Sequence, residues 1–121
     1  MLENRFENLK VWEKAHEMTL KVYLVSSKFP NEERFGLVQQ LRRAASSVPA
    51  NIVEGNARRN IGEYLQFLNI AFASLQETKY HLYLSRDLGY INQEEYQGLI
   101  RIADEVGKMC TVLIRNLKSK V

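Results

Sequence analysis

Residues 46–55 read SSVPANIVEG and place a proline inside a stretch that otherwise has the pattern of one long amphipathic helix. The apolar residues around it are spaced by three or four, in one narrow stripe: Leu41, Ala45, Val48, Ile52 and Gly55. Because this stripe keeps its phase across Pro49, the pattern predicts a continuous helix with a kink. We expect the hydroxyls of Ser46 and Ser47 to help satisfy the groups that the proline frees, the Ala45 carbonyl above all. The alternative is a helix that stops before Pro49, because residues before a proline avoid the α region.

Turn signals on either side of this stretch divide the chain into four helical segments. Pro30-Asn31, Asn60 and the segment 89–92 are the expected boundaries, and no run with the alternation of a strand lies between them. Predicted helices cover 9–28, 32–58, 61–88 and 93–119. Connections this short make neighbouring helices antiparallel. The sequence therefore predicts an all-α fold, an antiparallel up-down-up-down four-helix bundle with a proline-kinked second helix, as a single domain over 1–121.

Capping residues support two of these boundaries. Asn60 and Asn92 are each followed three residues later by a glutamate, which is the pattern of a helix N-cap. Gly89 follows Leu88 directly and suits the left-handed residue that closes a helix.

Composition sets limits on the class of protein. The chain has 121 residues, of which 45% are hydrophobic, and this is enough for one modest core. Cys110 is the single cysteine, so an intrachain disulfide is excluded and a reducing compartment is favoured. Neither a signal peptide nor a membrane span is recognisable, and we expect a cytoplasmic protein. The net charge of +3 permits an acidic partner such as nucleic acid but does not require one.

The third predicted helix is apolar on more than one face. Its core stripe is expected to contain Ile61, Leu65, Leu68, Phe72, Leu75 and Leu82. Further apolar residues lie on the sides and back of the helix: Phe67, Ile70, Ala73, Leu84 and Leu88. On the first helix, apolar residues also extend beyond the core stripe: Val11, Met18 and Val25. Large apolar area outside the core favours self-association, and the alternative is a monomer with a broad core face.

Basic residues repeat every seven positions on the first and last helices: Lys14, Lys21 and Lys28, and Arg101, Lys108 and Arg115. Together with Lys118 near the C-terminal end, we interpret them as candidate nucleic-acid contacts. Rows of cations bind phosphate backbones without base-specific geometry. The plainer alternative is a solvated face, because Glu13, Glu17, Asp104 and Glu105 interleave with these cations.

Candidate catalytic and metal-binding patterns are weak. Glu13 and His16 have the Glu-x-x-His spacing of di-iron bundles, but Glu13 points away from the core stripe. Glu77 and His81 are spaced by four on the back of the third helix, and we expect both histidines to be partly exposed or interfacial. Cys110 is in phase with core positions and is expected to be a small core residue. We therefore expect no enzyme activity, no metal and no cofactor.

The polar side of the proline-containing helix is a candidate subunit interface. Asn51 and Glu54 share it with Arg43 and Arg58, and Glu54 can pair with Arg58 four residues on. We expect Arg42 or Arg43, from the same or a neighbouring chain, to be a further partner of Glu54. The interface set is Arg42, Arg43, Asn51, Glu54, Phe67 and Ile70. In the alternative interpretation, Asn51 and Glu54 line a ligand or RNA site.

Four segments carry a family resemblance: LKVWEKA (9–15), FGLVQQLRRAASSVPANIVEG (35–55), FLNIAFASLQET (67–78) and LGYI (88–91). Together they resemble the small four-helix bundle proteins encoded in intervening sequences of bacterial 23S ribosomal RNA genes. The resemblance implies a ring-like homopentamer. It also implies a likeness to the accessory protein of diversity-generating retroelements, which binds a reverse transcriptase and nucleic acid. Val53 stands where the family usually has alanine.

Two functions follow as expectations. The first is a non-enzymatic, oligomeric helical bundle that binds RNA or another nucleic acid through its basic stripes. The alternative is a protein-interaction scaffold that binds no nucleic acid, in which the apolar faces serve assembly and the arginines form internal ion pairs.

Overall fold

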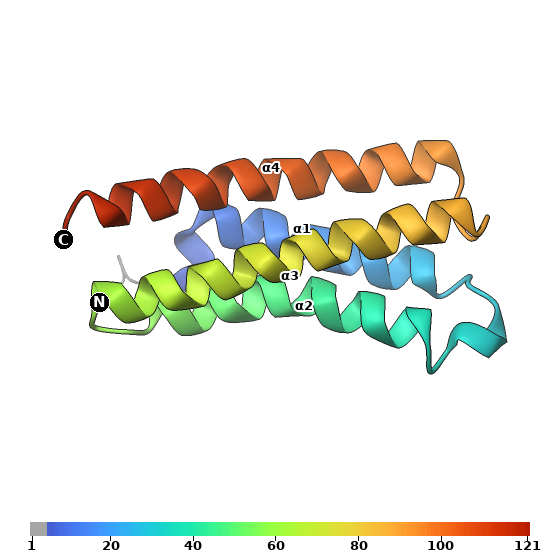
Figure 1. Ribbon diagram of the computed structural model, residues 1–121, viewed down its shortest axis with the longest axis horizontal. Helices are drawn as coiled ribbons and strands as arrows, with labels where there is room; N and C mark the ends of the chain where they lie inside the picture. The colour runs from blue at the N-terminus through green and yellow to red at the C-terminus, as the bar shows by residue number, and fades with distance from the viewer. Residues whose placement is uncertain (1–4) are drawn as a thin grey trace.

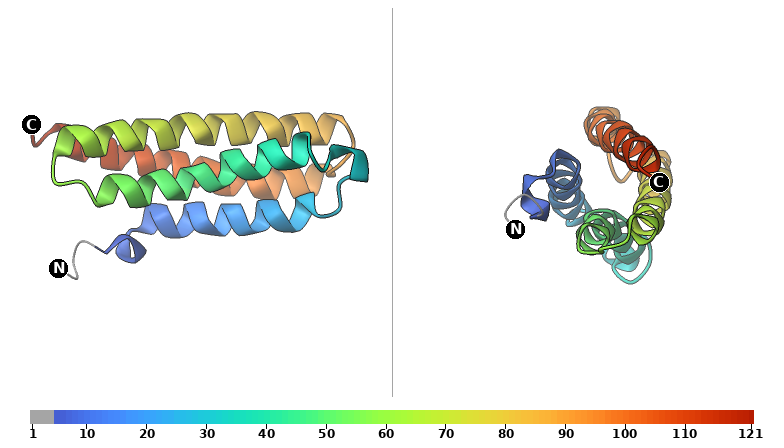
Figure 2. Two further views of the ribbon diagram at one scale, coloured as in Figure 1. Left: turned by 90° about the horizontal axis from the view of Figure 1, so that it is seen from below. Right: turned by 90° about the vertical axis from the view of Figure 1, so that its left-hand side faces the viewer.

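The computed structural model describes residues 5–121, which form four long helices and two short 3-10 turns. The helices are α1 (Lys10–Ser26), α2 (Leu37–Asn56), α3 (Ile61–Asp87) and α4 (Gln93–Lys118), and the turns are η2 (Phe6–Asn8) and η3 (Asn31–Glu33). Consecutive helices run in opposite directions (Figure 1). Seen end-on, they occupy the four corners of a bundle (Figure 2). The predicted all-α four-helix bundle is confirmed, and residues 5–121 contain no strand.

Helix α2 is shorter than the predicted 32–58. The chain first makes the η3 turn, and Gly36 then has non-helical backbone angles (φ −114°, ψ −108°), so that α2 begins at Leu37. A carboxylate oxygen of Glu33 accepts a hydrogen bond from the Leu37 amide (3.2 Å) and caps this start. The helix ends at Asn56, and the residues after it leave the helical path.

Pro49 lies inside α2, which continues on both sides of it, so the alternative of two separate helices is wrong. Pro49 has no N–H to donate to the carbonyl of Ala45. That carbonyl instead accepts a hydrogen bond from the hydroxyl of Thr19 on α1 (3.1 Å). The expected help from Ser46 and Ser47 is not found at this carbonyl, because Ser46 donates to the Arg43 carbonyl. The proline thus creates an acceptor through which α1 and α2 are joined, and the kink itself stays a prediction.

Ser47 has a different role, at the contact between α2 and α3. Its hydroxyl lies 2.9 Å from that of Ser74. Further along, Gly55 is buried against α3, and a Cβ added there would lie 2.9 Å from the Cβ of Phe67 and from a ring carbon of Tyr64. Small residues at these positions allow the two helices to approach closely.

The buried residues confirm the α2 stripe and correct the expected stripe of α3. Leu68, Leu75 and Leu82 are fully buried, but Phe72 is 36% exposed. The intervening core positions of α3 are instead small residues: Ala71, Thr78 and Ser85. The sequence pattern favoured the larger apolar side chain, whereas close packing requires small ones here.

On α1, the apolar residues beyond the predicted stripe belong to the core. Val11 and Met18 are buried, and Val25 is packed against the core, so they do not form the exposed apolar area that we expected. The exposed apolar residues of this helix are Leu20, Tyr23 and Leu24.

The predicted helix caps are confirmed. The side chain of Asn60 accepts from the amide of Glu63 (3.1 Å). Asn92 and Glu95 form a reciprocal capping box, which lowers the pKa of Glu95, chiefly through the hydrogen bond from the Asn92 amide. Gly89 has the left-handed backbone (φ 82°) that closes α3. These caps determine where α3 begins and ends and where α4 begins.

Candidate nucleic-acid interface

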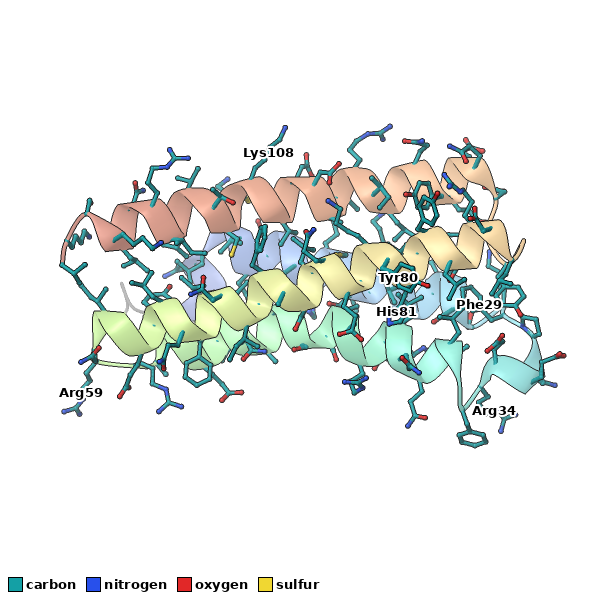
Figure 3. The ribbon with its side chains drawn as sticks, in the orientation of Figure 1. Phe29, Arg34, Arg59, Tyr80, His81 and Lys108 are labelled. Atoms are coloured by element: carbon teal, nitrogen blue, oxygen red, sulfur yellow. The ribbon has the colours of Figure 1, made fainter. Side chains whose placement is uncertain are left out.

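The basic residues of α4 form an exposed row. Arg101, Lys108 and Arg115 are spaced by seven along the helix, and Lys118 follows in its last turn. All are exposed, and none makes an ion pair within 4 Å in residues 5–121. Lys108 projects outward from α4 (Figure 3). From Arg101 to Arg115 the row is about 21 Å long at the rise of an α-helix.

The carboxylates of α4 are mostly paired with cations from outside this helix. Asp104 pairs with Lys79 of α3 (2.8 Å), Glu105 with Lys14 of α1 (3.5 Å), and Glu95 with Lys28 in the turn after α1 (3.4 Å). These acids therefore do not neutralise the cations of their own helix. The expected interleaving of charges is present in the sequence, but within the described part of the chain it leaves Arg101, Lys108, Arg115 and Lys118 without ion-pair partners.

The basic row of α1 has a different environment. Lys14 pairs with Glu105 and also with Glu17 (3.6 Å), and the Coulombic attraction of these carboxylates, Glu105 first, raises the pKa of Lys14. Lys28 pairs with Glu95. Lys21 is exposed and has no such partner among the described residues. Two of the three candidates from the first predicted helix thus have intramolecular partners, Lys14 in α1 and Lys28 just after it, and we leave them out of the proposed surface.

A groove runs between α3 and α4 beside the basic row. One hollow of about 580 Å³ is bordered by Phe72 and Lys79 on one side and by Lys108 and Arg115 on the other. A second hollow of about 480 Å³ is lined by Lys79, Tyr80, Tyr83, Tyr96, Ile100 and Asp104. Lys79 and Asp104 line both hollows, and their ion pair crosses from α3 to α4 between them. We call the two hollows together the α3/α4 groove.

The aromatic end of this groove was not predicted from the sequence. The guanidinium carbon of Arg86 lies 4.6 Å from the centre of the Tyr83 ring and 4.4 Å from that of Tyr96, between α3 and α4. Tyr83 and Tyr96 also meet edge to face, with their ring centres 6.4 Å apart. Tyr80 lies three residues before Tyr83 and is 58% exposed. The spacing of Tyr80 and Tyr83, three residues apart and outside the core stripe, was the one sequence signal for this cluster. The position of Tyr96 beside them depends on the register between α3 and α4.

The residues that we assigned to a subunit interface on α2 separate in the structure. Arg42 donates to the Ser26 hydroxyl (2.8 Å) and to the Tyr23 carbonyl (3.2 Å), so it joins α2 to α1. Arg43 lies 4.0 Å from Glu77 of α3. Asn51 donates to the carbonyl and hydroxyl of Ser47, within its own helix.

Glu54 is exposed, and no ion pair within 4 Å is found for it in the described part of the chain. The expected pair with Arg58 is wrong, because α2 ends at Asn56 and Arg58 no longer follows the helical spacing. The Arg58 guanidinium instead lies over the Phe67 ring, 4.6 Å from its centre. Among residues 5–121, neither Arg42 nor Arg43 forms an ion pair with Glu54, because Arg42 contacts α1 and Arg43 lies near Glu77 of α3. A partner from a second chain stays a prediction.

Phe67 and Ile70 remain candidates for self-association. Phe67 is half-buried against Gly55 of α2, and Ile70 is 49% exposed. Residues three apart on a helix are neighbours, so both belong to the side of α3 that borders α2. This side is distinct from the α3/α4 groove.

The titratable residues considered for catalysis have structural surroundings. His16 stacks on Trp12, with ring centres 5.0 Å apart and planes 7° from parallel. His81 is buried, contrary to the expectation of partial exposure, with Nε2 3.2 Å from a Glu77 oxygen. Cys110 is buried as predicted, and its burial raises the pKa of its thiol to about 11. A thiol with this pKa is almost entirely protonated at neutral pH and is a poor nucleophile.

Fold and surface together define a small four-helix bundle whose last helix has a row of cations that form no ion pair with the residues from 5 to 121. The chain belongs to the family of 23S rRNA-intervening sequence proteins. Residues 7–112 match the model of this family. This confirms the resemblance found in the four sequence segments. A protein of unknown function from the S23 ribosomal protein family of Bacteroides thetaiotaomicron has a similar crystal structure, with 26% sequence identity and a TM-score of 0.80. The similarity covers 86% of this chain and 97% of that chain.

A comparison with curated proteins gave no match. Among residues 5–121, no helix is long and apolar enough to cross a membrane.

Proposed function

We propose that this protein is a non-enzymatic, self-associating helical bundle that binds RNA or another nucleic acid through the basic row of α4. The observation that supports it most is that Arg101, Lys108, Arg115 and Lys118 have no ion-pair partner within residues 5–121, although three α4 carboxylates are paired with lysines from outside α4. Lysine and arginine side chains without an ion-pair partner can neutralise the phosphates of a nucleic acid. Binding is then driven by the release of the counterions that were condensed on those phosphates.

Self-association is the second part of the proposal. Phe67 and Ile70 present apolar surface beside α2, and Glu54 lies exposed on α2 without an ion-pair partner in residues 5–121. The family resemblance implies five subunits in a ring, and a ring would repeat each α4 row once per subunit. By the same resemblance, a reverse transcriptase is a candidate protein partner, and the cytoplasm is the expected compartment.

Salt dependence tests the nucleic-acid proposal. We expect the affinity for a labelled generic RNA to fall steeply with ionic strength, losing close to one power of salt per phosphate neutralised. The double variant Lys108→Gln/Arg115→Gln should weaken binding and flatten this slope by about two.

The matched control is Lys14→Gln/Lys28→Gln. It removes the same formal charge from residues that already have carboxylate partners, so it should leave the slope nearly unchanged. Equal effects of the two double variants would show a response to net charge alone and would contradict a site on α4. If the wild-type protein binds no RNA even at low salt, the scaffold function is favoured instead.

A further inference from the structure

We propose that the α3/α4 groove binds single-stranded nucleic acid, with bases stacked on its tyrosines and phosphates held at its basic end. The inference rests on the proposed function, because it names the kind of nucleic acid and the path that this acid follows. It is carried by the position of an exposed aromatic cluster at one end of a groove whose other end is bordered by unpaired cations.

The aromatic end has the properties of a stacking platform. Tyr80 and Tyr83 are 58% and 49% exposed, far more than residues whose rings serve the core. The Tyr83 ring meets that of Tyr96 edge to face across the two helices but stays exposed, whereas Tyr96 is partly buried against the core. Every base has a flat π-face, so exposed tyrosine rings bind single strands with little dependence on sequence.

The platform is held in place by a cation. Arg86 lies against both Tyr83 and Tyr96, and these contacts connect α3 to α4. Arg86 is also 3.3 Å from Asp87 through its Nε atom. Because Arg86 lies against the Tyr83 and Tyr96 rings before any ligand binds, a base that stacks on Tyr83 loses less free energy to the ordering of side chains.

The other end of the groove supplies charge. Lys108 and Arg115 border the larger hollow, and the one carboxylate that lines it, Asp104, is paired with Lys79. From Tyr96 to Arg115 the groove follows α4 for about 28 Å, which is long enough for several nucleotides. A duplex hides its base faces inside the stack, so it can use the basic end but not the tyrosines. This difference identifies a single strand as the ligand.

The test measures the affinity of the 121-residue chain for a fluorescein-labelled oligouridylate and for a blunt RNA duplex of equal length, by fluorescence anisotropy at one salt concentration. Tyr80→Ala should weaken binding of the single strand roughly 5- to 100-fold, whereas Tyr80→Phe should keep the wild-type affinity because it keeps the ring. Both variants should bind the duplex as the wild type does. Phe35→Ala is the matched control, because Phe35 is an 82% exposed aromatic residue outside the groove.

Each contrary result has a distinct meaning. If Tyr80→Ala binds the single strand as well as the wild type does, while Lys108→Gln/Arg115→Gln weakens it, the basic row stands and the stacking site is wrong. A wild-type preference for the duplex would also overturn the inference. A change in particle mass for Tyr80→Ala would assign the groove to contact between subunits instead. Circular dichroism of each variant establishes that the helices are intact, and Tyr83→Ala with Tyr83→Phe provides an independent second pair.

Discussion

Replacing Thr19 with valine should destabilise the bundle through the carbonyl that Pro49 leaves without a helical partner. Valine keeps the shape and branching of threonine but removes the hydroxyl, which donates to the Ala45 carbonyl at 3.1 Å. Thr19 is buried, so the Ala45 carbonyl would lose its partner out of reach of water. Such a loss costs about 1–3 kcal/mol. The hydroxyl has one proton, which the Ala45 carbonyl shares with the Ala15 carbonyl at 2.9 Å, and the Ala15 carbonyl lies inside α1 and keeps its helical hydrogen bond.

The assay is urea denaturation followed by circular dichroism, at fixed protein concentration, for a double-mutant cycle. We expect Thr19→Val alone to lower the free energy of unfolding by about 2 kcal/mol, which corresponds to a fall in Tm of about 8 °C for a chain of this size. In the Pro49→Ala background a backbone N–H again faces the Ala45 carbonyl, so there the same substitution should cost less than about 1 kcal/mol.

The control is Thr111→Val. Thr111 also donates to the carbonyl four residues earlier (2.9 Å), but it is exposed and makes no contact of this kind with another helix. Its replacement should change the free energy of unfolding by less than about 0.5 kcal/mol. An equal cost of Thr19→Val in both backgrounds would refute the link between the threonine and the proline.

Three further results are expected. Gly55→Ala should destabilise the fold by about 1–2 kcal/mol in urea denaturation, because the added Cβ would lie 2.9 Å from Phe67. A Cβ added at Gly98 has open space around it, so Gly98→Ala should stabilise α4 by about 0.5–1 kcal/mol. Changes of the same sign for the two variants would contradict the close α2–α3 packing. Cys110 should resist a thiol reagent at pH 8 in the folded protein and react once urea unfolds it, because burial raises its pKa to about 11 and only about one thiol in a thousand is ionised; rapid labelling of the folded chain would show that the thiol is accessible. Ile70→Glu should reduce the particle mass in light scattering without loss of helicity, since Ile70 lies outside the core; an unchanged mass would remove this face from the subunit contact.

Local features of the fold could be predicted from the sequence because their causes lie within a few residues. Asn92 and Glu95 are three apart, and a capping box needs only that spacing. The apolar stripe of α2 likewise keeps its spacing across Pro49, and this predicted the continuous helix that is found. The bond from Thr19 to the Ala45 carbonyl could not be predicted, because it depends on how far α1 slides along α2.

In the candidate site, too, features within one helix could be predicted, whereas features that depend on contacts between helices could not. The spacing of Arg101, Lys108 and Arg115 predicted an exposed row, and its lack of ion pairs depends on Lys14 and Lys79 from other helices. The tyrosine platform was missed because Tyr96 and Tyr83 come from different helices, whose register only the folded chain sets. The prediction that Phe72 belongs to the core was wrong for another reason. Its large apolar side chain suggested the core, but close packing of the helices places small residues such as Ala71 there instead.

Photocrosslinking tests the central claim most directly. The wild-type protein is bound to an oligouridylate that carries photoreactive 4-thiouridine, irradiated, digested and sequenced by mass spectrometry to locate the attached nucleotides. We predict crosslinks to Tyr80, Tyr83 and the part of α4 between Tyr96 and Arg115, all bordering the α3/α4 groove. Crosslinks confined to α2, or to the exposed Arg34 and Phe35, would place the nucleic acid elsewhere and would contradict the account.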